Sequence, residues 1–159
     1  MTLRRDITER TDILRFLLQL SEMVGRRARR YGVAGRTVHV VVRFADFTTI
    51  GRQETFPRSM NQSEDIYRAA VQILDTLDLS QPVRLLGVRI TNLCYQREQL
   101  PLFENERRKA FMMHAMDSVN NRYGDFTVTF GRLLDSSDKG SHVISPAWRP
   151  DGIRNITIT

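Results

Sequence analysis

The residue types that most often carry out catalysis are few in this sequence and lie far apart. The three histidines are His39, His114 and His142, and none has a second metal-type ligand three or four positions away. The single cysteine, Cys94, has no histidine near it in sequence that would activate a thiolate. No glycine-rich phosphate loop or nucleophile elbow is present. We therefore expect no self-contained active site, no bound cofactor or metal and no disulfide framework.

A short segment with the composition of a docking peptide spans residues 99–103. It combines one glutamine amide, which forms directional hydrogen bonds, with a proline and three side chains that fill apolar pockets. The proline restricts the backbone and so lowers the entropy lost on docking. These residues are Gln99, Leu100, Pro101, Leu102 and Phe103. From composition alone, the favoured interpretation buries the two leucines and the phenylalanine in the domain's own core.

A second segment places arginines on two predicted strands. Apolar and more polar residues alternate over 36–44, which predicts a half-buried strand. A turn at 45–48 leads to a second strand over roughly 49–56, which is polar for its length, as edge strands often are. We expect Pro57 to end this strand. An arginine side chain binds two phosphate oxygens at once, so this segment is suited to meet a polyanion.

The surrounding elements predict the layer that would hold these strands. Apolar residues at spacings of three and four predict helices over 9–31 and 62–78, and alternation predicts a third strand over 83–91. The order predicts an α+β fold, with an antiparallel β-sheet and both helices on one face. The opposite face would be free and polar. We expect it to carry Thr37, His39, Arg43, Thr49, Gly51, Gln53 and Arg89.

The remainder of the chain predicts a C-terminal helical extension. Apolar spacing predicts a helix over 104–123, and residues 126–134 are expected to form a short strand. The rest, to residue 159, is rich in Ser, Gly, Pro and Asp, and we expect a loosely ordered tail. No apolar run approaches the roughly 18 residues of a membrane span. The start is charged rather than apolar, so the cytosol is the simplest compartment.

The charge of the chain suits a polyanionic partner. The chain has 159 residues and a formal net charge of +6, and all but two of its 24 basic residues are arginine. Most of the excess lies in residues 1–36, where Arg26, Arg27, Arg29 and Arg30 end the first predicted helix. We expect these four to complement the helix dipole and to solvate its outer face. A phosphate-facing patch is the alternative.

Together these segments resemble a known family. The run RTVHVVVRFADFTTIGRQETFP, followed by PVRLLGV, resembles the little-finger domain of the Y-family translesion DNA polymerases, the class of DinB (DNA polymerase IV) and UmuC. QLPLF resembles the pentapeptide by which bacterial polymerases bind the β sliding clamp. The resemblance covers roughly residues 2–103. HAMDSVNNRYGDFTVTFG looks like the extension that follows the clamp motif in some UmuC-type relatives.

The resemblance implies a domain that lays its sheet on the major-groove side of primer–template DNA during translesion synthesis and DNA repair. Phosphate contacts would position the protein without reading sequence. The residues that the resemblance assigns to DNA are Arg43, Thr49, Gly51, Arg52, Gln53, Arg84 and Arg89. The residues that it assigns to the clamp are Gln99, Leu100, Leu102 and Phe103.

The resemblance also implies a division of the chain. Residues 1–93 would be a little-finger-like domain whose first strand is mostly missing. Residues 94–103 would be a linker and clamp peptide, and 104–159 an extension. The palm domain, with its Mg²⁺ and the DNA polymerase chemistry, would lie upstream, so that the chain would be a non-catalytic C-terminal fragment of a cytoplasmic, nucleoid-associated enzyme.

Two other functions remain open from the sequence. A stand-alone α/β module could bind single-stranded RNA or DNA by stacking bases on sheet aromatics. Phe44 and Phe56 are both assigned inward, which disfavours that module. A protein–protein adaptor would use QLPLF as its only functional element. A comparison of affinity for duplex and for single strands would separate the single-strand module from the polymerase fragment, and absence of salt-sensitive DNA binding would favour the adaptor.

Overall fold

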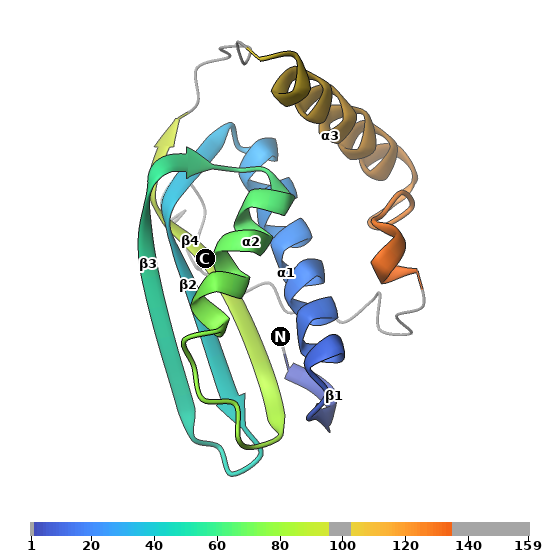
Figure 1. Ribbon diagram of the computed structural model, residues 1–159. Coiled ribbons are helices and arrows are strands. Elements are labelled where there is room, and N and C mark those ends of the chain that lie inside the picture. Colours follow the sequence, from blue (N-terminus) through green and yellow to red (C-terminus); the bar gives the residue numbers. More distant parts are fainter. Residues whose placement is uncertain (1, 96–102, 135–159) are drawn as a thin grey trace, which may run out of the picture.

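The computed structural model describes residues 2–95 and 103–134, which form an α+β domain with a helical extension (Figure 1). A short 3₁₀ helix, Gly131–Leu133, follows the last α-helix. The other elements, in chain order, are β1 (Thr2–Ile7), α1 (Arg10–Arg30), β2 (Val33–Phe44), β3 (Thr49–Met60), α2 (Ser63–Leu74), β4 (Val83–Tyr95) and α3 (Glu104–Tyr123). The expected tail from residue 135 to residue 159 lies outside the described residues.

The sheet is antiparallel and has the order β1-β4-β2-β3. β2 is central to the three long strands, and pairs with β3 on one side and β4 on the other. The family resemblance implies a first strand that is mostly missing. Residues 2–7 form the six-residue strand β1, which pairs with the beginning of β4. β3 is therefore the long strand at the edge of the sheet.

Both α1 and α2 lie on one face of the sheet, as predicted (Figure 1). Alternate residues of β2, Val38, Val40 and Val42, are fully buried under these helices. Leu17 of α1 and Leu74 of α2 pack into the same core and are also fully buried. Burial of these apolar side chains is the main favourable contribution to folding. The period-two pattern of β2 therefore fixes which face the helices cover and leaves its other residues on the opposite face.

A glycine lets the beginning of α2 come close to α1. A Cβ on Gly25 would lie 2.7 Å from the Ser63 hydroxyl, closer than real Cβ atoms come, and 3.0 Å from the Asn61 carbonyl oxygen, which is tighter than most Cβ contacts. The glycine therefore permits an approach that any side chain would prevent. As a result, Asn61 and Ser63 come within reach of Arg29, one turn further along α1.

Some boundaries differ from the sequence-based expectations. β3 does not end at Pro57 but continues to Met60. The pairing with β2 changes from Thr37–Thr55 to Gly35–Met60, so that Pro57 lies in an irregular stretch of an edge strand. A proline is tolerated there because its missing N–H removes no ladder hydrogen bond. The helix expected over 62–78 ends at residue 74, and β4 runs on from residue 91 to residue 95.

The strand expected over 126–134 is wrong. This stretch forms turns and the 3₁₀ helix, and Phe126 adopts a φ of 62°. The Asn120 side chain accepts a hydrogen bond from the Val128 N–H at 2.8 Å and donates one to the Val128 carbonyl at 2.9 Å. The Asn120 side chain thus occupies the N–H and C=O groups of Val128 that would otherwise bind an adjacent strand.

The extension lies beside α1 and α2, on the helical side of the sheet (Figure 1). α3 has the bounds that the sequence predicts. Lys109 of α3 forms an ion pair with Glu64 of α2 at 2.9 Å, and the 3₁₀ helix contacts α1. No helix in residues 2–95 and 103–134 is long and apolar enough to cross a membrane.

Candidate nucleic-acid interface

The register of β2 with β3 and β4 sets the composition of the open sheet face. Directly opposite residues of antiparallel strands point to the same side, so each cross-strand row belongs to one face. The four rows on the side away from the helices are Thr55–Thr37–Thr91, Gln53–His39–Arg89, Gly51–Val41–Gly87 and Thr49–Arg43–Leu85. These rows contain all seven residues that the sequence placed on the free face. We call these twelve residues the open face.

A histidine lies at the centre of the open face between an arginine and a threonine. The Arg89 guanidinium donates to His39 Nδ1 at 3.2 Å, and His39 Nε2 lies 2.9 Å from Thr91 Oγ1. Arginine has no acceptor, so Nδ1 must accept and the imidazole proton resides on Nε2. Burial, followed by the charge of Arg89, lowers the pKa of His39. A neutral His39 therefore leaves the charge of Arg89 uncompensated.

A second guanidinium lies in the row nearest the β2–β3 turn. Arg43 is exposed, and its Nε donates to Thr49 Oγ1 at 2.9 Å. Threonine is neutral and does not compensate the charge. Within residues 2–95 and 103–134, neither Arg43 nor Arg89 forms an ion pair with a carboxylate. Both retain N–H groups and a full positive charge for an anionic ligand.

The row between these arginines has a glycine on each of the two strands that flank β2, namely β3 and β4. Gly51 and Gly87 flank Val41 in one row across all three strands. A Cβ on Gly51 would meet its nearest neighbour at 3.5 Å, and one on Gly87 at 3.7 Å, both ordinary contacts. Backbone is therefore exposed at Gly51 and Gly87 because these residues have no side chain, whereas the Val41 side chain lies between them. A ligand can approach the sheet backbone closely there.

The remaining basic residues assigned to DNA lie away from the open face. Arg52 is opposite Val40, so its side chain is on the helical side of the edge strand, where it is exposed. Arg84 lies at the register shift at the beginning of β4, 3.7 Å from Asp6 of β1 and over the Phe47 ring. The open face thus brings together Arg43, Thr49, Gly51, Gln53 and Arg89, and leaves Arg52 and Arg84 at its margins.

The expected clamp peptide is only partly described. Gln99, Leu100 and Leu102 lie outside the described residues. Phe103 is the residue before α3 and 69% of its surface is exposed. Burial of this phenylalanine in the domain's own core, which composition alone favoured, is therefore wrong.

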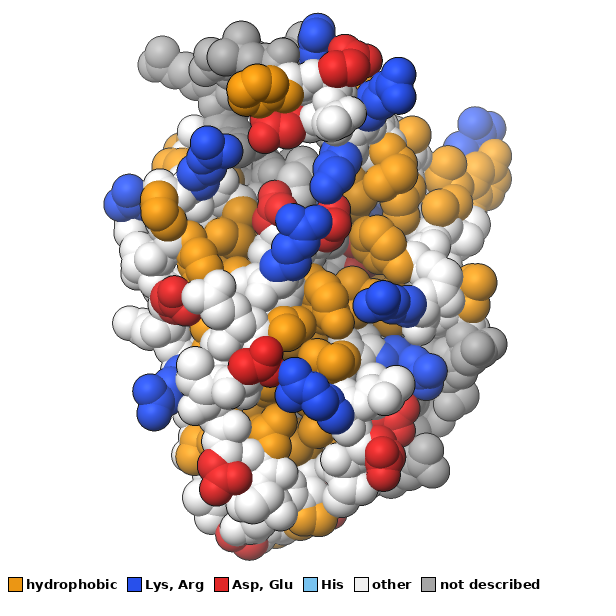
Figure 2. All heavy atoms as spheres, in the orientation of Figure 1, with side chains coloured by type: hydrophobic (Ala, Val, Ile, Leu, Met, Phe, Trp, Pro, Cys, Tyr) orange, Lys and Arg blue, Asp and Glu red, His pale blue; other side chains and the backbone are white. Residues whose placement is uncertain are grey.

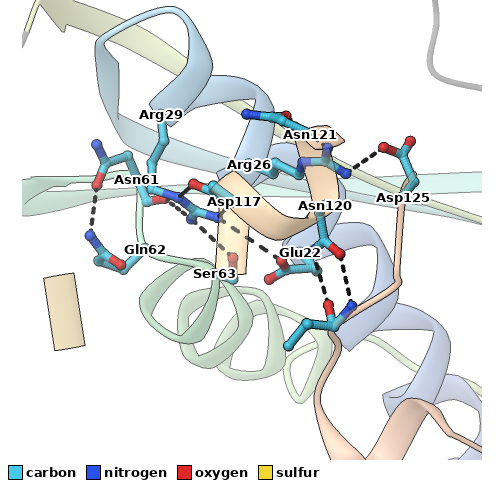
Figure 3. Close-up of polar contacts among 11 residues, drawn as sticks. Glu22, Arg26, Arg29, Asn61, Gln62, Ser63, Asp117, Asn120, Asn121 and Asp125 are labelled. Carbon is cyan, nitrogen blue, oxygen red and sulfur yellow. Dashed lines mark hydrogen bonds and ion pairs between the residues drawn. The ribbon is translucent and has the colours of Figure 1, made fainter. Parts of the chain in front are cut away.

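Two of the four arginines at the end of α1, Arg26 and Arg29, have a role that differs from both expected ones. Arg29 is bidentate to Asp117 of α3, with Nε–Oδ2 and Nη2–Oδ1 distances of 2.6 and 2.9 Å (Figure 3). Its Nη1 also donates to the Asn61 carbonyl at 2.9 Å and to Ser63 Oγ at 3.2 Å. Only 11% of the Arg29 side chain is exposed. Arg29 therefore holds α1, α2 and α3 together and is not available to phosphate.

A buried glutamate lies beside this ion pair. Glu22 is 3% exposed, and its Oε1 lies 4.0 Å from Arg29 Nη2. Burial raises the pKa of Glu22 above its ordinary value, although Ser63 and Arg29 act in the opposite direction. Two carboxylates thus share one arginine, and Asp117 has the better geometry.

Arg26 extends the same contact toward the end of α3. It forms an ion pair with Asp125 and donates to Asn121 Oδ1 at 2.9 Å (Figure 3). On this helical side of the molecule, Lys and Arg side chains are interspersed with Asp and Glu (Figure 2). Here positive charge is balanced by acidic side chains, whereas on the open face it is not. This pairing could not be predicted from local patterns, because Arg26 and Asp125 are 99 residues apart.

No group of three or more potential ligands that could hold a metal ion occurs among residues 2–95 and 103–134. The open face offers hydrogen-bond donors, two arginines without an acidic partner among the described residues, and exposed backbone at two glycines. Such a surface can bind a polyanionic rod through its phosphates, and has no group placed for bond-breaking chemistry.

Comparison with known proteins shows the family of the chain. Residues 1–102 match the impB/mucB/samB family C-terminal domain, and the chain belongs to this family. The DNA polymerase IV 2 of Bacillus subtilis (strain 168) is 38% identical in an alignment of 133 residues that covers 80% of this chain and 32% of that protein. The DNA polymerase IV of Pelotomaculum thermopropionicum is 35% identical over 130 residues, with the same coverage. The chain thus spans about a third of the length of these relatives.

A solved structure shares the fold. A DinB family error-prone DNA polymerase from Sulfolobus solfataricus matches 60% of this chain and 28% of its own, with 18% identity and a TM-score of 0.51. The resemblance to Y-family polymerases inferred from the sequence is confirmed by the family match, and so is the α+β fold class.

Proposed function

We propose that the open face binds the sugar–phosphate backbone of duplex primer–template DNA, as the C-terminal, non-catalytic part of a Y-family translesion polymerase. The observation that carries the proposal is the pair of guanidinium groups, Arg43 and Arg89, which have only neutral partners among the described residues. Phosphate neutralisation releases condensed counterions, which favours binding without regard to sequence. A polymerase that copies any template requires contacts of this kind.

The arrangement across the sheet supports a grip along one strand of the duplex. Arg43 and Arg89 lie on either side of the row Gly51–Val41–Gly87, where the absence of side chains at the two glycines leaves the sheet backbone accessible to a sugar–phosphate backbone. Gln53 and Thr49 add neutral polar groups on the edge strand. Arg52 and Arg84, at the margins, are proposed to make weaker contacts. The chemistry of synthesis and its Mg²⁺ would belong to another domain of the polymerase, which would act on nucleoid DNA in the cytoplasm.

The test of DNA binding is the salt dependence of duplex affinity. Removing both cations with Arg43→Ala and Arg89→Ala is expected to weaken binding and to flatten the slope of log K against log salt by about 0.9 for each lost contact. Arg68→Ala is the matched control, since Arg68 is an exposed arginine on the helical side that pairs with Glu64. A double variant with the wild-type slope would refute the proposal.

We also propose that QLPLF binds a β sliding clamp and holds the polymerase near the primer end, where tethering raises its effective concentration. Exposure of Phe103 supports this role. The double change of Leu102 and Phe103 to alanine should abolish retention of the full chain by the clamp in a pull-down. Phe111→Ala, which removes an exposed phenylalanine from α3, is the control and should bind normally. Unchanged binding of the double variant would disprove the tether.

Two other functions are less well supported. A single-strand platform on the sheet would need outward aromatics, but Phe44 is buried and Phe56 packs against the core. None of the twelve residues of the open face is phenylalanine, tyrosine or tryptophan. A pure adaptor would show no salt-sensitive binding to DNA, so the same titration separates it from the proposed function.

A further inference from the structure

The turn between β2 and β3 holds a phenylalanine in an unfavourable backbone conformation. Phe44 N–H donates to the Thr48 carbonyl at 2.9 Å, and Phe47 N–H donates to the Phe44 carbonyl at 3.0 Å. Phe47 has a φ of 68°, in the left-handed region. In short hairpin loops of this kind glycine or asparagine usually takes that position. A positive φ is unfavourable for a residue with a bulky side chain, so Phe47 destabilises the turn relative to glycine.

Burial does not explain the phenylalanine either. The side chain is 64% exposed at the end of the hairpin. The turn has a further hydrogen bond that does not involve the ring, in which the Asp46 carboxylate accepts the Thr48 N–H at 2.8 Å, and this bond also lowers the pKa of Asp46. Neither the turn nor the core therefore needs an aromatic ring at this position.

The ring is nevertheless held in place from one side. The Arg84 guanidinium lies over the Phe47 ring, 4.9 Å from its centroid, which is a cation–π contact. Arg84 is itself positioned by Asp6 of β1, at 3.7 Å. Three segments, β1, β4 and the turn, thus combine to fix an exposed aromatic ring.

This ring is directly linked to the open face. Thr49 Oγ1 accepts from Arg43 Nε at 2.9 Å and lies 3.5 Å from the Phe47 carbonyl oxygen, to which it donates. A phosphate-binding arginine and an exposed ring therefore lie at the same end of the sheet. A nucleotide offers both groups that this combination recognises, an anionic phosphate and a flat base.

We propose that Phe47, backed by Arg84, is a stacking platform for an unpaired nucleobase where a nucleic-acid strand leaves the duplex bound on the open face. The inference rests on the proposed duplex binding and adds a single-stranded subsite to it. Stacking on an aromatic ring is tolerant of sequence, because every base has a π-face. The sequence analysis treated residues 45–48 only as a turn and did not identify this residue.

The test compares two DNA probes with the full 159-residue chain. One is a blunt duplex, and the other is the same duplex with a single-stranded overhang, on either strand, that carries a fluorescent purine analogue. The wild-type chain should bind one of the overhang probes more tightly than the blunt probe and should quench its fluorescence. Phe47→Gly should remove about a fivefold or larger preference for that overhang, as expected for one stacked base.

Two variants keep the result interpretable. Phe47→Gly suits a positive φ, so the variant should fold, and it should bind the blunt duplex with unchanged affinity and salt slope. Phe47→Trp keeps an aromatic face and should retain the overhang preference and the quenching. An overhang preference that survives Phe47→Gly would overturn the platform and leave duplex binding intact. A wild-type chain that binds neither probe would overturn both proposals.

Discussion

The arginines on the two sides of the sheet illustrate how position decides the use of one side chain. On the helical side, Arg26 and Arg29 bind carboxylates of the extension, and the pairs are partly or largely buried. On the open face, Arg43 and Arg89 bind a threonine and a neutral histidine. The first pair is used to assemble the protein and the second remains available to a ligand. Local charge density along the sequence pointed to α1, whereas the two arginines proposed to bind DNA lie on the sheet.

The largest expected effect concerns the assembling arginine. Arg29→Ala would leave Asp117 and Glu22 without their shared cation and would remove the bonds to Asn61 and Ser63. The free energy of unfolding should fall by about 3–5 kcal/mol, as when one partner of a buried pair is removed. Urea unfolding followed by circular dichroism measures it.

An exposed pair serves as the control for that measurement. Arg10 and Asp75 form an ion pair at 2.6 Å, with about half of each side chain exposed. Arg10→Ala should cost less than about 1 kcal/mol. Equal losses for Arg10→Ala and Arg29→Ala would show that burial does not distinguish the two pairs.

The next effect concerns the glutamate beside Arg29. Because the pKa of Glu22 is raised in the folded state, that state binds a proton more readily than the unfolded chain. The resulting contribution to stability is full below the ordinary carboxylate pKa and is lost as pH rises through the raised value. Glu22→Gln should therefore remove this fall in stability. The prediction is contradicted if the melting temperature of the wild type rises with pH between the ordinary and the raised carboxylate pKa and equals that of Glu22→Gln at each pH.

A smaller effect is expected when one arginine of the open face and one of the helical side are compared by the salt dependence of duplex binding. Arg89→Gln should reduce the salt slope of duplex binding by about 0.9, because one phosphate contact is lost. Arg26→Gln should leave the slope unchanged, because its guanidinium already has a carboxylate partner. The comparison fails if both substitutions change the slope equally.

The smallest effect is a titration shift on the open face. His39 should titrate below an ordinary histidine in an NMR experiment, and Arg89→Gln should bring its pKa part of the way back. The recovery is partial because burial, which remains, is the larger cause. Since the folded-state pKa is lowered, the associated stability is fully present above the ordinary histidine pKa and is lost as pH falls from there through the lowered folded-state pKa. An unchanged His39 pKa in Arg89→Gln would argue against their contact.

The sheet and its open face could be predicted from the sequence because both follow from local periodicity. Alternation in β2 assigns each residue to a face, and pairing with two neighbours extends the assignment across the sheet. The position of Arg52 follows from the same rule, since its alternation with Gly51 and Gln53 puts it on the helical side. Its assignment to DNA came from the family resemblance and not from that pattern.

Other features depend on contacts that local patterns do not contain. The docking of α3 requires Arg29 to meet Asp117, 88 residues away in sequence. The non-strand conformation near Val128 depends on a single amide, that of Asn120. The position of Arg84 follows from a register shift between strands. Each is decided by tertiary geometry, which composition and spacing leave open.

Pro57 has a consequence for the behaviour of the protein at high concentration. The strand β3 is twelve residues long and lies at the edge of the sheet, where unpaired backbone groups could recruit a strand from another molecule. Pro57 removes one donor from that edge and lies where the register is irregular. It thereby interrupts the template that a second copy would need, and helps to guard the protein against edge-to-edge aggregation.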